Sequence, residues 1–254
     1  MAFKFNYFKN IENKYKTRFS LKKPIVIRLD GKNVCKNPAI NLLDETKQHF
    51  SFSLNHTAKA MSRKFNAICF SSTDEINILI LDPSFLLRHY NTIECQKLSS
   101  FVAQEVFSTF NNLYIGEKIF FDARTFNIPE NKAQSYISYR VGMAKNVYTN
   151  YYAKKLLSTR ERVNVKLDIL DSTLNTLSEE YRNRSNHNTY GAIYYNGYEI
   201  QFSDLPSTQM SITELISFLS GFKEDTVIYD LDTSDNITSY ETDSNSDFID
   251  DILL

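Results

Sequence analysis

The chain has 254 residues, of which 42% are hydrophobic and 23% are charged, so it can bury a large globular core. Its net charge of −1 excludes an overall basic signature of nucleic-acid binding, although acids accumulate after Lys223 and leave the preceding part basic. No segment has the pattern of a signal peptide or membrane span, and the three cysteines lack metal-binding spacing. We therefore expect a cytoplasmic protein in a reducing compartment, with no membrane partner.

The first two predicted elements are a helix and a strand, and the strand ends at an aspartate. Residues 3–20 combine aromatics and lysines at helical spacing, which predicts a helix packed on the core. The apolar run Ile25–Leu29 predicts a strand that ends at Asp30 and Gly31, where a glycine suits a sharp bend or a close approach to a ligand. Backbone N–H groups of the loop at 31–43 suit a triphosphate, although the loop has no Walker pattern.

A helix and an acidic hairpin follow this loop. The helix is predicted to begin near Asp44, and its apolar residues, of which Phe65 is the last, fall on one face. The hairpin is predicted at 67–80, because apolar residues alternate on both of its arms. Asp74 and Glu75 stand at its tip, directly before an isoleucine-rich strand. Charge held this close to a core usually has a partner, and a bound cation is one such partner.

The middle of the chain predicts two more long helices and a strand. The helices are expected at about 90–110 and 132–157, and the strand between them at 117–129. Together with the earlier strands, this order predicts an α+β fold with an antiparallel sheet of the split β-α-β type and helices on one face.

Three parts of the chain are expected to differ in character. Residues 1–157 are predicted to form the main domain, and residues 158–222 a C-terminal extension of short helices and a hairpin packed on it. That hairpin is expected to turn at Asn196-Gly197. Residues 223–254 are rich in Asp, Ser, Thr and Asn, which predicts an acidic, flexible tail.

Asp30 and Asp74 stand at strand ends that neighbouring strands would bring together. Either aspartate alone would be explained as a turn residue. Two carboxylates at adjoining strand ends make an all-oxygen site suited to Mg²⁺, whose remaining ligands come from water and substrate phosphates. A pair of such ions about 4 Å apart is the usual apparatus of nucleotidyl transfer, so the pair of aspartates favours a metal site.

Four segments resemble motifs of the tRNA-histidine guanylyltransferase family and its 3′-to-5′ polymerase relatives, in the same order and spacing. They are IVIRLDGKNV at 25–34, SSTDEINILI at 71–80, FFDART at 120–125 and SYISYR at 135–140. Ala123 stands where the family has glycine. The resemblance, which covers about residues 5–200, implies a polymerase-palm-like (ferredoxin-like) fold, with residues 1–157 as the palm-like catalytic domain.

The resemblance also implies the site residues. Asp30, Asp74 and Glu75 would be catalytic; the two aspartates would ligate two Mg²⁺ ions with help from the Gly31 carbonyl, and Glu75 would support them. Arg124 would be a charge partner for phosphates or acids. The residues implied to bind the nucleotide are Asp30, Gly31, Lys32, Asn33, Val34, Cys35, Thr73, Asp74 and Lys97.

The implied function is that of a Mg²⁺-dependent nucleotidyltransferase that adds nucleotides to the 5′ end of tRNA, in end repair or guanylation. ATP or GTP would activate a 5′-monophosphate, and the 3′-hydroxyl of an incoming nucleoside triphosphate would then attack that end. The implied partners are GTP, ATP, tRNA and further copies of the chain in a tetramer or dimer. Residues 144–150 lack the histidine of the eukaryotic signature, which favours the relatives that act on 5′-truncated tRNAs.

Two other function classes stay open at this point. A palm-like nucleotide cyclase or signalling synthase shares the acidic hairpin and would form a cyclic or dinucleotide product without RNA. An inactive palm used to bind nucleotide or RNA is the second alternative, and the presence of both Asp30 and Asp74 disfavours it.

Overall fold

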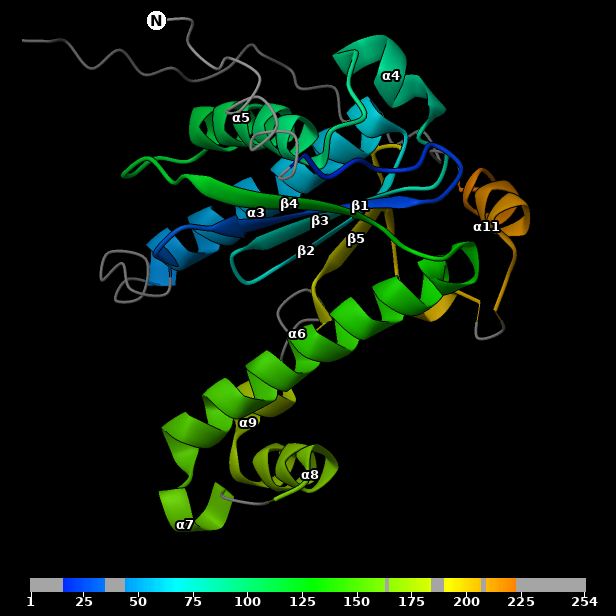
Figure 1. Cartoon of the computed structure of the whole chain (residues 1–254). Helices are drawn as coiled ribbons and strands as arrows, with labels where there is room; N and C mark the ends of the chain where they lie inside the picture. Colours follow the sequence, from blue (N-terminus) through cyan, green and yellow to red (C-terminus); the bar gives the residue numbers. More distant parts are fainter. Residues whose placement is uncertain (1–15, 35–43, 163–164, 184–189, 207–208, 223–254) are drawn as a thin grey trace, which may run out of the picture. The chain divides into compact units, whose positions relative to one another are not determined.

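The computed structural model describes residues 16–34, 44–162, 165–183, 190–206 and 209–222 (Figure 1). The chain divides into two compact units, Met1–Lys223 and Glu224–Leu254, and all of the described residues belong to the first. The helix expected at 3–20 and the tail expected at 223–254 fall wholly or mainly outside the described ranges and stay predictions. No helix in these ranges is both long and apolar enough to cross a membrane.

A six-stranded antiparallel sheet forms the centre of the described structure. Its strands are β1 (Ile25–Gly31), β2 (Ile68–Ser72), β3 (Glu75–Ile80), β4 (Phe121–Asn127), β5 (Ala192–Tyr195) and β6 (Tyr198–Ile200). They lie in the order β4-β1-β3-β2-β5-β6. The β5–β6 hairpin turns at Asn196 and Gly197, whose φ values of 48° and 86° suit a tight two-residue loop. The predicted α+β class with an antiparallel sheet and a C-terminal hairpin is confirmed.

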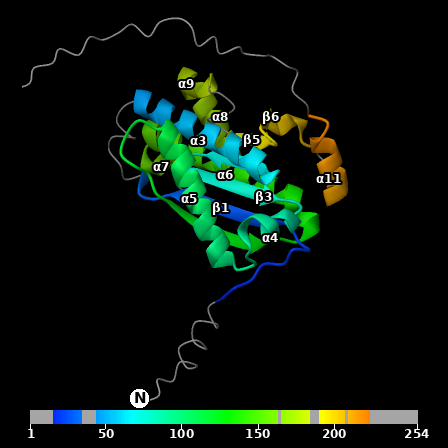
Figure 2. The ribbon, with the colours of Figure 1, turned by 90° about the horizontal axis from the view of Figure 1, so that it is seen from above.

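Helices α3 (Asp44–Phe65) and α5 (Cys95–Leu113) cover one face of the sheet, as the view from above shows (Figure 2). Both helices bury one apolar stripe in the same core cluster as Ile27 and Leu29 of β1. The buried hydrophobic residues of α3 have the spacing that predicted this face, and they are Phe50, Leu54, Ala58, Met61 and Phe65. Helical periodicity therefore placed the correct side of α3 on the sheet.

The opposite face of the sheet is also covered. Helices α6 (Ala133–Leu156) and α11 (Ile212–Leu219) pack there, and Ile137 and Leu215 share an apolar cluster with Val26 of β1. The expectation of helices on one face thus describes α3 and α5 only. Every residue of the central strand β3 is buried, and a strand that is apolar on both sides needs a cover on each.

The C-terminal half of α6 runs away from the sheet toward three shorter helices (Figure 1). These are α7 (Thr159–Arg162), α8 (Leu167–Leu177) and α9 (Glu179–Arg182). Tyr181 is fully buried between α6 and α8, and its hydroxyl donates a 2.6 Å hydrogen bond to Asp171. The remaining described elements are α4 (Ser84–Tyr90) and the 3₁₀ turns η2 (Glu130–Lys132) and η3 (Phe202–Asp204).

The tight hairpin turn allows a test of the fold. A Cβ added to Gly197 would overlap the side chain of Arg63, and its positive φ disfavours any other residue. We expect Gly197→Ala to lower the free energy of unfolding by about 1–2 kcal/mol, measured by urea denaturation. Gly142 is the matched control, because a Cβ there meets no atom within 4 Å in helix α6. Gly142→Ala should raise stability by about 0.5–1 kcal/mol, and a similar loss in both variants would contradict the turn geometry.

Candidate active site

The ends of three strands meet beside the β2–β3 turn. Asp30, near the end of β1, pairs with Glu75 of β3 on one side and with Asp122 of β4 on the other. Asp74 lies in the turn between β2 and β3, and its carbonyl accepts a 2.7 Å hydrogen bond from the Gly31 amide. The structure therefore brings Asp30 and Asp74 together, although they are far apart in the sequence. We call this end of the sheet the catalytic edge, after the two aspartates that the sequence predicts to be catalytic.

The carboxylate of Asp30 responds to the charges around it. Burial raises the pKa of Asp30, the negative charge of Asp74 raises this pKa further, and the guanidinium of Arg28 opposes both effects. About half of the Asp30 side chain, 54%, is nevertheless exposed, so a ligand can reach it. Asp74 accepts a 3.2 Å hydrogen bond from the hydroxyl of Thr73. Two carboxylates that repel each other at an exposed edge are stabilised by a cation bound between them.

The donors at this edge are suited to Mg²⁺. Asp30 and Asp74 offer carboxylate oxygens, and the backbone of Gly31 lies in hydrogen-bond contact with Asp74. Within the described ranges, no three His, Cys, Asp or Glu side chains are grouped so as to hold an ion. Mg²⁺ usually takes one or two carboxylates and fills its octahedron with waters and substrate phosphates, so two aspartates are an adequate protein contribution.

Glu75 is buried between two arginines. Its Oε2 accepts a 2.7 Å hydrogen bond from Arg28, and its Oε1 accepts hydrogen bonds from Arg140 and from Asn77 Nδ2, the latter at 2.6 Å. The residue is 5% exposed, and both carboxylate oxygens already have donors. Glu75 therefore joins helix α6 to the sheet, and this geometry favours an anchoring role over direct catalysis.

The sequence patterns did not identify this arginine network. Tyr136 extends it by donating a 2.6 Å hydrogen bond to Asn77 Oδ1, and burial raises the pKa of Tyr136 to about 12. Arg28 did carry a signal, because a charge inside a strand of isoleucine and leucine needs a buried partner. Tyr136 and Arg140 stand four residues apart on a helix, but helical spacing says nothing about which strand residues they meet.

Gly31 allows the loop after β1 to approach Asp74. A Cβ at this position would lie 2.7 Å from Val34 Cγ2 and 3.1 Å from the Asp74 carbonyl oxygen. Val34 itself is buried, whereas Thr73 is exposed at the turn with a φ of 55°. Of the predicted nucleotide-binding residues, Gly31, Val34 and Thr73 therefore border the two aspartates.

Lys32 and Asn33 lie exposed in the same loop. The Lys32 amide donates a 2.8 Å hydrogen bond to the Phe120 carbonyl, so only the Lys32 side chain can contact a phosphate without breaking that bond. Asn33 adopts a left-handed backbone with a φ of 62°. Cys35 lies outside the described residues, and its predicted contact stays a prediction.

Lys97 lies far from the catalytic edge. It belongs to the first turn of α5, where it forms a 3.3 Å ion pair with Glu94. The other end of α5 reaches the catalytic edge, because Phe110 packs on Phe121, the pairing partner of Gly31. A helical rise of about 1.5 Å per residue puts Lys97 roughly 20 Å from Phe110. Within one described chain, the fold does not bring Lys97 to the aspartates.

Arg124 lies on β4, in register with Arg28. Its guanidinium is 3.5 Å from Asp122, and their side chains are 73% and 63% exposed. An exposed pair of this kind contributes little to stability, so Arg124 can leave Asp122 for another anion at small cost.

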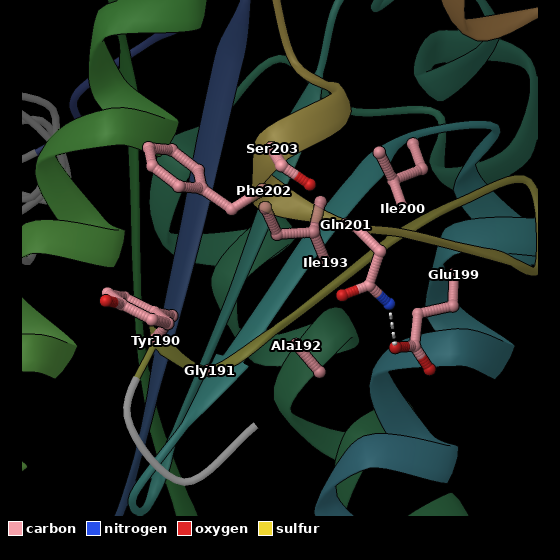
Figure 3. Close-up of a pocket in the computed structure, with 9 residues that line it drawn as sticks. All are labelled: Tyr190, Gly191, Ala192, Ile193, Glu199, Ile200, Gln201, Phe202 and Ser203. Carbon is pink, nitrogen blue, oxygen red and sulfur yellow. Dashed lines mark hydrogen bonds between the residues drawn. The ribbon is translucent and has the colours of Figure 1, made fainter. Parts of the chain in front are cut away.

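A cavity of about 250 Å³ lies along β5 and β6 (Figure 3). Tyr190 and Phe202 stand on one side of the view, and Gln201 and Glu199 on the other, joined by a 3.1 Å hydrogen bond. The cavity is lined by none of the predicted site residues, and it is smaller than the roughly 300–1,000 Å³ usual for ligand pockets. We therefore place the candidate site at the open catalytic edge.

No protein-family profile matches the chain, and no curated protein matches it. Solved structures do match. A bacterial tRNA(His) guanylyltransferase (Thg1)-like protein in complex with ATP superposes with a TM-score of 0.63 at 16% identity, over 84% of this chain and 98% of its own. A similar bacterial protein in complex with GTP gives 0.59 at 18% identity, over 74% and 82%.

A third match is the tRNA(His) guanylyltransferase of Saccharomyces cerevisiae. Its TM-score is 0.58 at 18% identity, and the match covers 78% of this chain and 95% of the yeast chain. At these identities the likeness shows a shared fold, and the palm-like fold expected from the sequence motifs is confirmed.

Proposed function

We propose that this chain, which has the fold of the tRNA(His) guanylyltransferase (Thg1)-like proteins, is a nucleotidyltransferase that adds nucleotides to the 5′ end of tRNA in the 3′-to-5′ direction. The proposal rests on one observation, the meeting of Asp30 and Asp74 at the catalytic edge. The matched structures in complex with ATP and GTP support the same class of substrate.

Asp30, Asp74 and the Gly31 carbonyl would hold two Mg²⁺ ions. When bound, Mg²⁺ lowers the pKa of the attacking hydroxyl and neutralises charge on the departing group. The exposure of the Asp30 carboxylate leaves room for waters and phosphate oxygens beside the protein ligands.

The chain's own residues would position the two reactants. The loop Gly31–Val34 and the Thr73 hydroxyl border the aspartates and would hold the triphosphate. Arg28 lies 3.9 Å from Asp30 with a third of its side chain exposed, and it would attract a phosphate to the same place. In the transfer, the 3′-oxygen of the incoming nucleotide bonds to the phosphorus at the RNA 5′ end. The bond from that phosphorus to its activating group breaks, and the hydroxyl proton leaves to solvent.

We further propose that the protein acts as a homo-oligomer, either a dimer or a tetramer. Large apolar side chains are exposed where α5 leads into β4, with Ile115 at 83% and Phe120 at 60%. The Phe120 ring stacks on Phe107 with centroids 4.9 Å apart. Exposed apolar residues that gather in this way are suited to be covered by a second copy.

A nucleotide-addition assay tests the function directly. The protein is incubated with Mg²⁺, labelled nucleoside triphosphates and a tRNA transcript that lacks its first nucleotide. We expect the tRNA to be extended at its 5′ end, and EDTA to stop the extension. A cyclic or dinucleotide product without RNA would instead support a cyclase or signalling synthase. If triphosphates and RNA bind but neither product forms, the palm is a binding module and the proposal fails.

A further inference from the structure

Helix α6 presents a row of exposed aromatic and apolar side chains. We call it the α6 stripe, and its members are Tyr139, Met143, Val147 and Tyr151. Tyr139, Val147 and Tyr151 are 55%, 49% and 50% exposed, and Met143 is partly buried. The four residues are spaced four apart, so they lie along one side of the helix. A contiguous row of this kind on a protein surface usually marks an interaction site.

The α6 stripe continues outward from the catalytic edge. Arg140, next to Tyr139 in the chain, pairs with Glu75, and Glu75 is the register partner of Asp30. Residues seven and eleven positions after Arg140 return to the same side of a helix, and these are Val147 and Tyr151. Arg140 thus marks the side of α6 that faces the acidic strand ends. Val147 and Tyr151 lie on the same side of the helix, farther from the sheet, and are exposed.

Positive charge accompanies these rings. Helix α6 contains no acidic residue in its 24 positions. The Arg140 guanidinium lies 5.5 Å from the centroid of the Tyr139 ring, and Lys47 Nζ lies 5.0 Å from that of Tyr151. Lys154, one turn beyond Tyr151, is exposed. Aromatic rings beside cations are how proteins bind a single nucleic-acid strand, with bases on the rings and phosphates on the cations.

We propose that the α6 stripe and Lys47 form a platform for the RNA strand next to its reacting end. Bases would stack on Tyr139 and Tyr151, and Lys47 and Lys154 would contact phosphates. The identification of RNA as the occupant rests on the proposed function. A second copy of the chain fits less well, because a self-interface over Tyr151 would bury the exposed Lys47 beside that ring, and lysine is depleted from interface cores.

RNA binding to stripe variants tests the platform. The probe is a 5′-monophosphorylated, 3′-labelled RNA of about 12 nucleotides, followed by fluorescence anisotropy. We expect Tyr151→Ala and Tyr139→Ala each to raise the Kd about fivefold or more, because each removes one stacked base. Tyr151→Phe keeps the ring and should stay within about twofold of wild type. Phe202→Ala, which removes an exposed aromatic outside the stripe, is the matched control and should leave the Kd unchanged.

The salt dependence of RNA binding distinguishes the contribution of the Lys47 cation from that of the Tyr151 ring. Lys47→Ala should reduce the slope of log Kd against log salt by about 0.7, the value for one lost phosphate contact on a single strand, whereas Tyr151→Ala should leave the slope unchanged. Lys22→Ala is the control, since this exposed lysine precedes β1 at the end of the strand opposite Asp30.

The outcomes separate this proposal from the proposed function. If the RNA binds through Tyr151 but no nucleotide is added, the function fails and the platform stands. If nucleotides are added while the stripe variants bind RNA as wild type does, the platform is wrong. It is also wrong if wild type does not bind the RNA. The platform proposal is also wrong if Tyr151→Ala leaves the RNA affinity unchanged and size-exclusion chromatography shows that the variant has changed from an oligomer to a monomer. The α6 stripe would then be an interface between copies of the chain.

Discussion

Asp74→Asn is expected to lower the rate of nucleotide addition to a tRNA 5′ end by about a thousandfold or more. Such a loss corresponds to about 4 kcal/mol of transition-state stabilisation, which is within the several kcal/mol that a bound metal supplies. The substitution removes one of the two aspartate charges proposed to hold the cation, so cation affinity should fall as well. The fold should remain, because the hydrogen bond from Gly31 is accepted by the Asp74 backbone and not by its side chain. Initial rates with labelled triphosphate, together with thermal melting, measure both effects.

Asp122→Asn is the matched control for this variant. Asp122 also stands beside Asp30, but its side chain is 63% exposed and pairs with Arg124 at 3.5 Å. We expect this control to keep the rate within a few fold of wild type. Full activity in Asp74→Asn would refute the metal assignment. An equal loss of rate in both variants would show that the total negative charge at this edge matters, and that Asp74 is not a specific metal ligand.

The sequence was most informative where local geometry decides the structure. Alternation of apolar residues in the hairpin at 67–80 predicted β2 and β3, because successive side chains in a strand point to opposite faces. Asn196-Gly197 predicted the last hairpin, because both residues readily adopt a positive φ. Asp30 and Asp74 followed from the same reasoning, since each stands where an apolar strand ends.

The sequence was least informative where distant segments pack together. One partner of Glu75 is Arg140, which lies on a helix that follows two further helices and a strand. Periodicity predicted that helix but not the strand it would meet. Glu75 was assigned to the catalytic site by motif resemblance, and its contacts with Arg28 and Arg140 favour an anchoring role. Lys97 was placed at the nucleotide by motif resemblance alone, and the length of α5 separates it from the catalytic edge.

Glu75→Gln is expected to destabilise the protein by about 3 kcal/mol or more. The change leaves the charge of Arg140, whose side chain is 12% exposed, without a counter-ion, and breaking a buried ion pair costs about 3–5 kcal/mol. The loss of the Glu75 charge costs less at Arg28, because the Arg28 side chain is 36% exposed and Asp30 still lies 3.9 Å away. Thermal melting should show a fall of roughly 10 °C in a protein of this size.

A surface pair and a double variant separate anchoring from catalysis. Lys64 and Glu105 lie 2.6 Å apart but are 43% and 38% exposed, so Glu105→Gln should cost less than about 1 kcal/mol. Replacing Glu75 and Arg140 together by methionine removes both charges, and it should restore much of the stability because no unpaired charge stays buried. If Glu75→Gln instead melts like wild type and yet adds no nucleotide, Glu75 acts in the chemistry, and the anchoring role inferred from its two arginines is wrong.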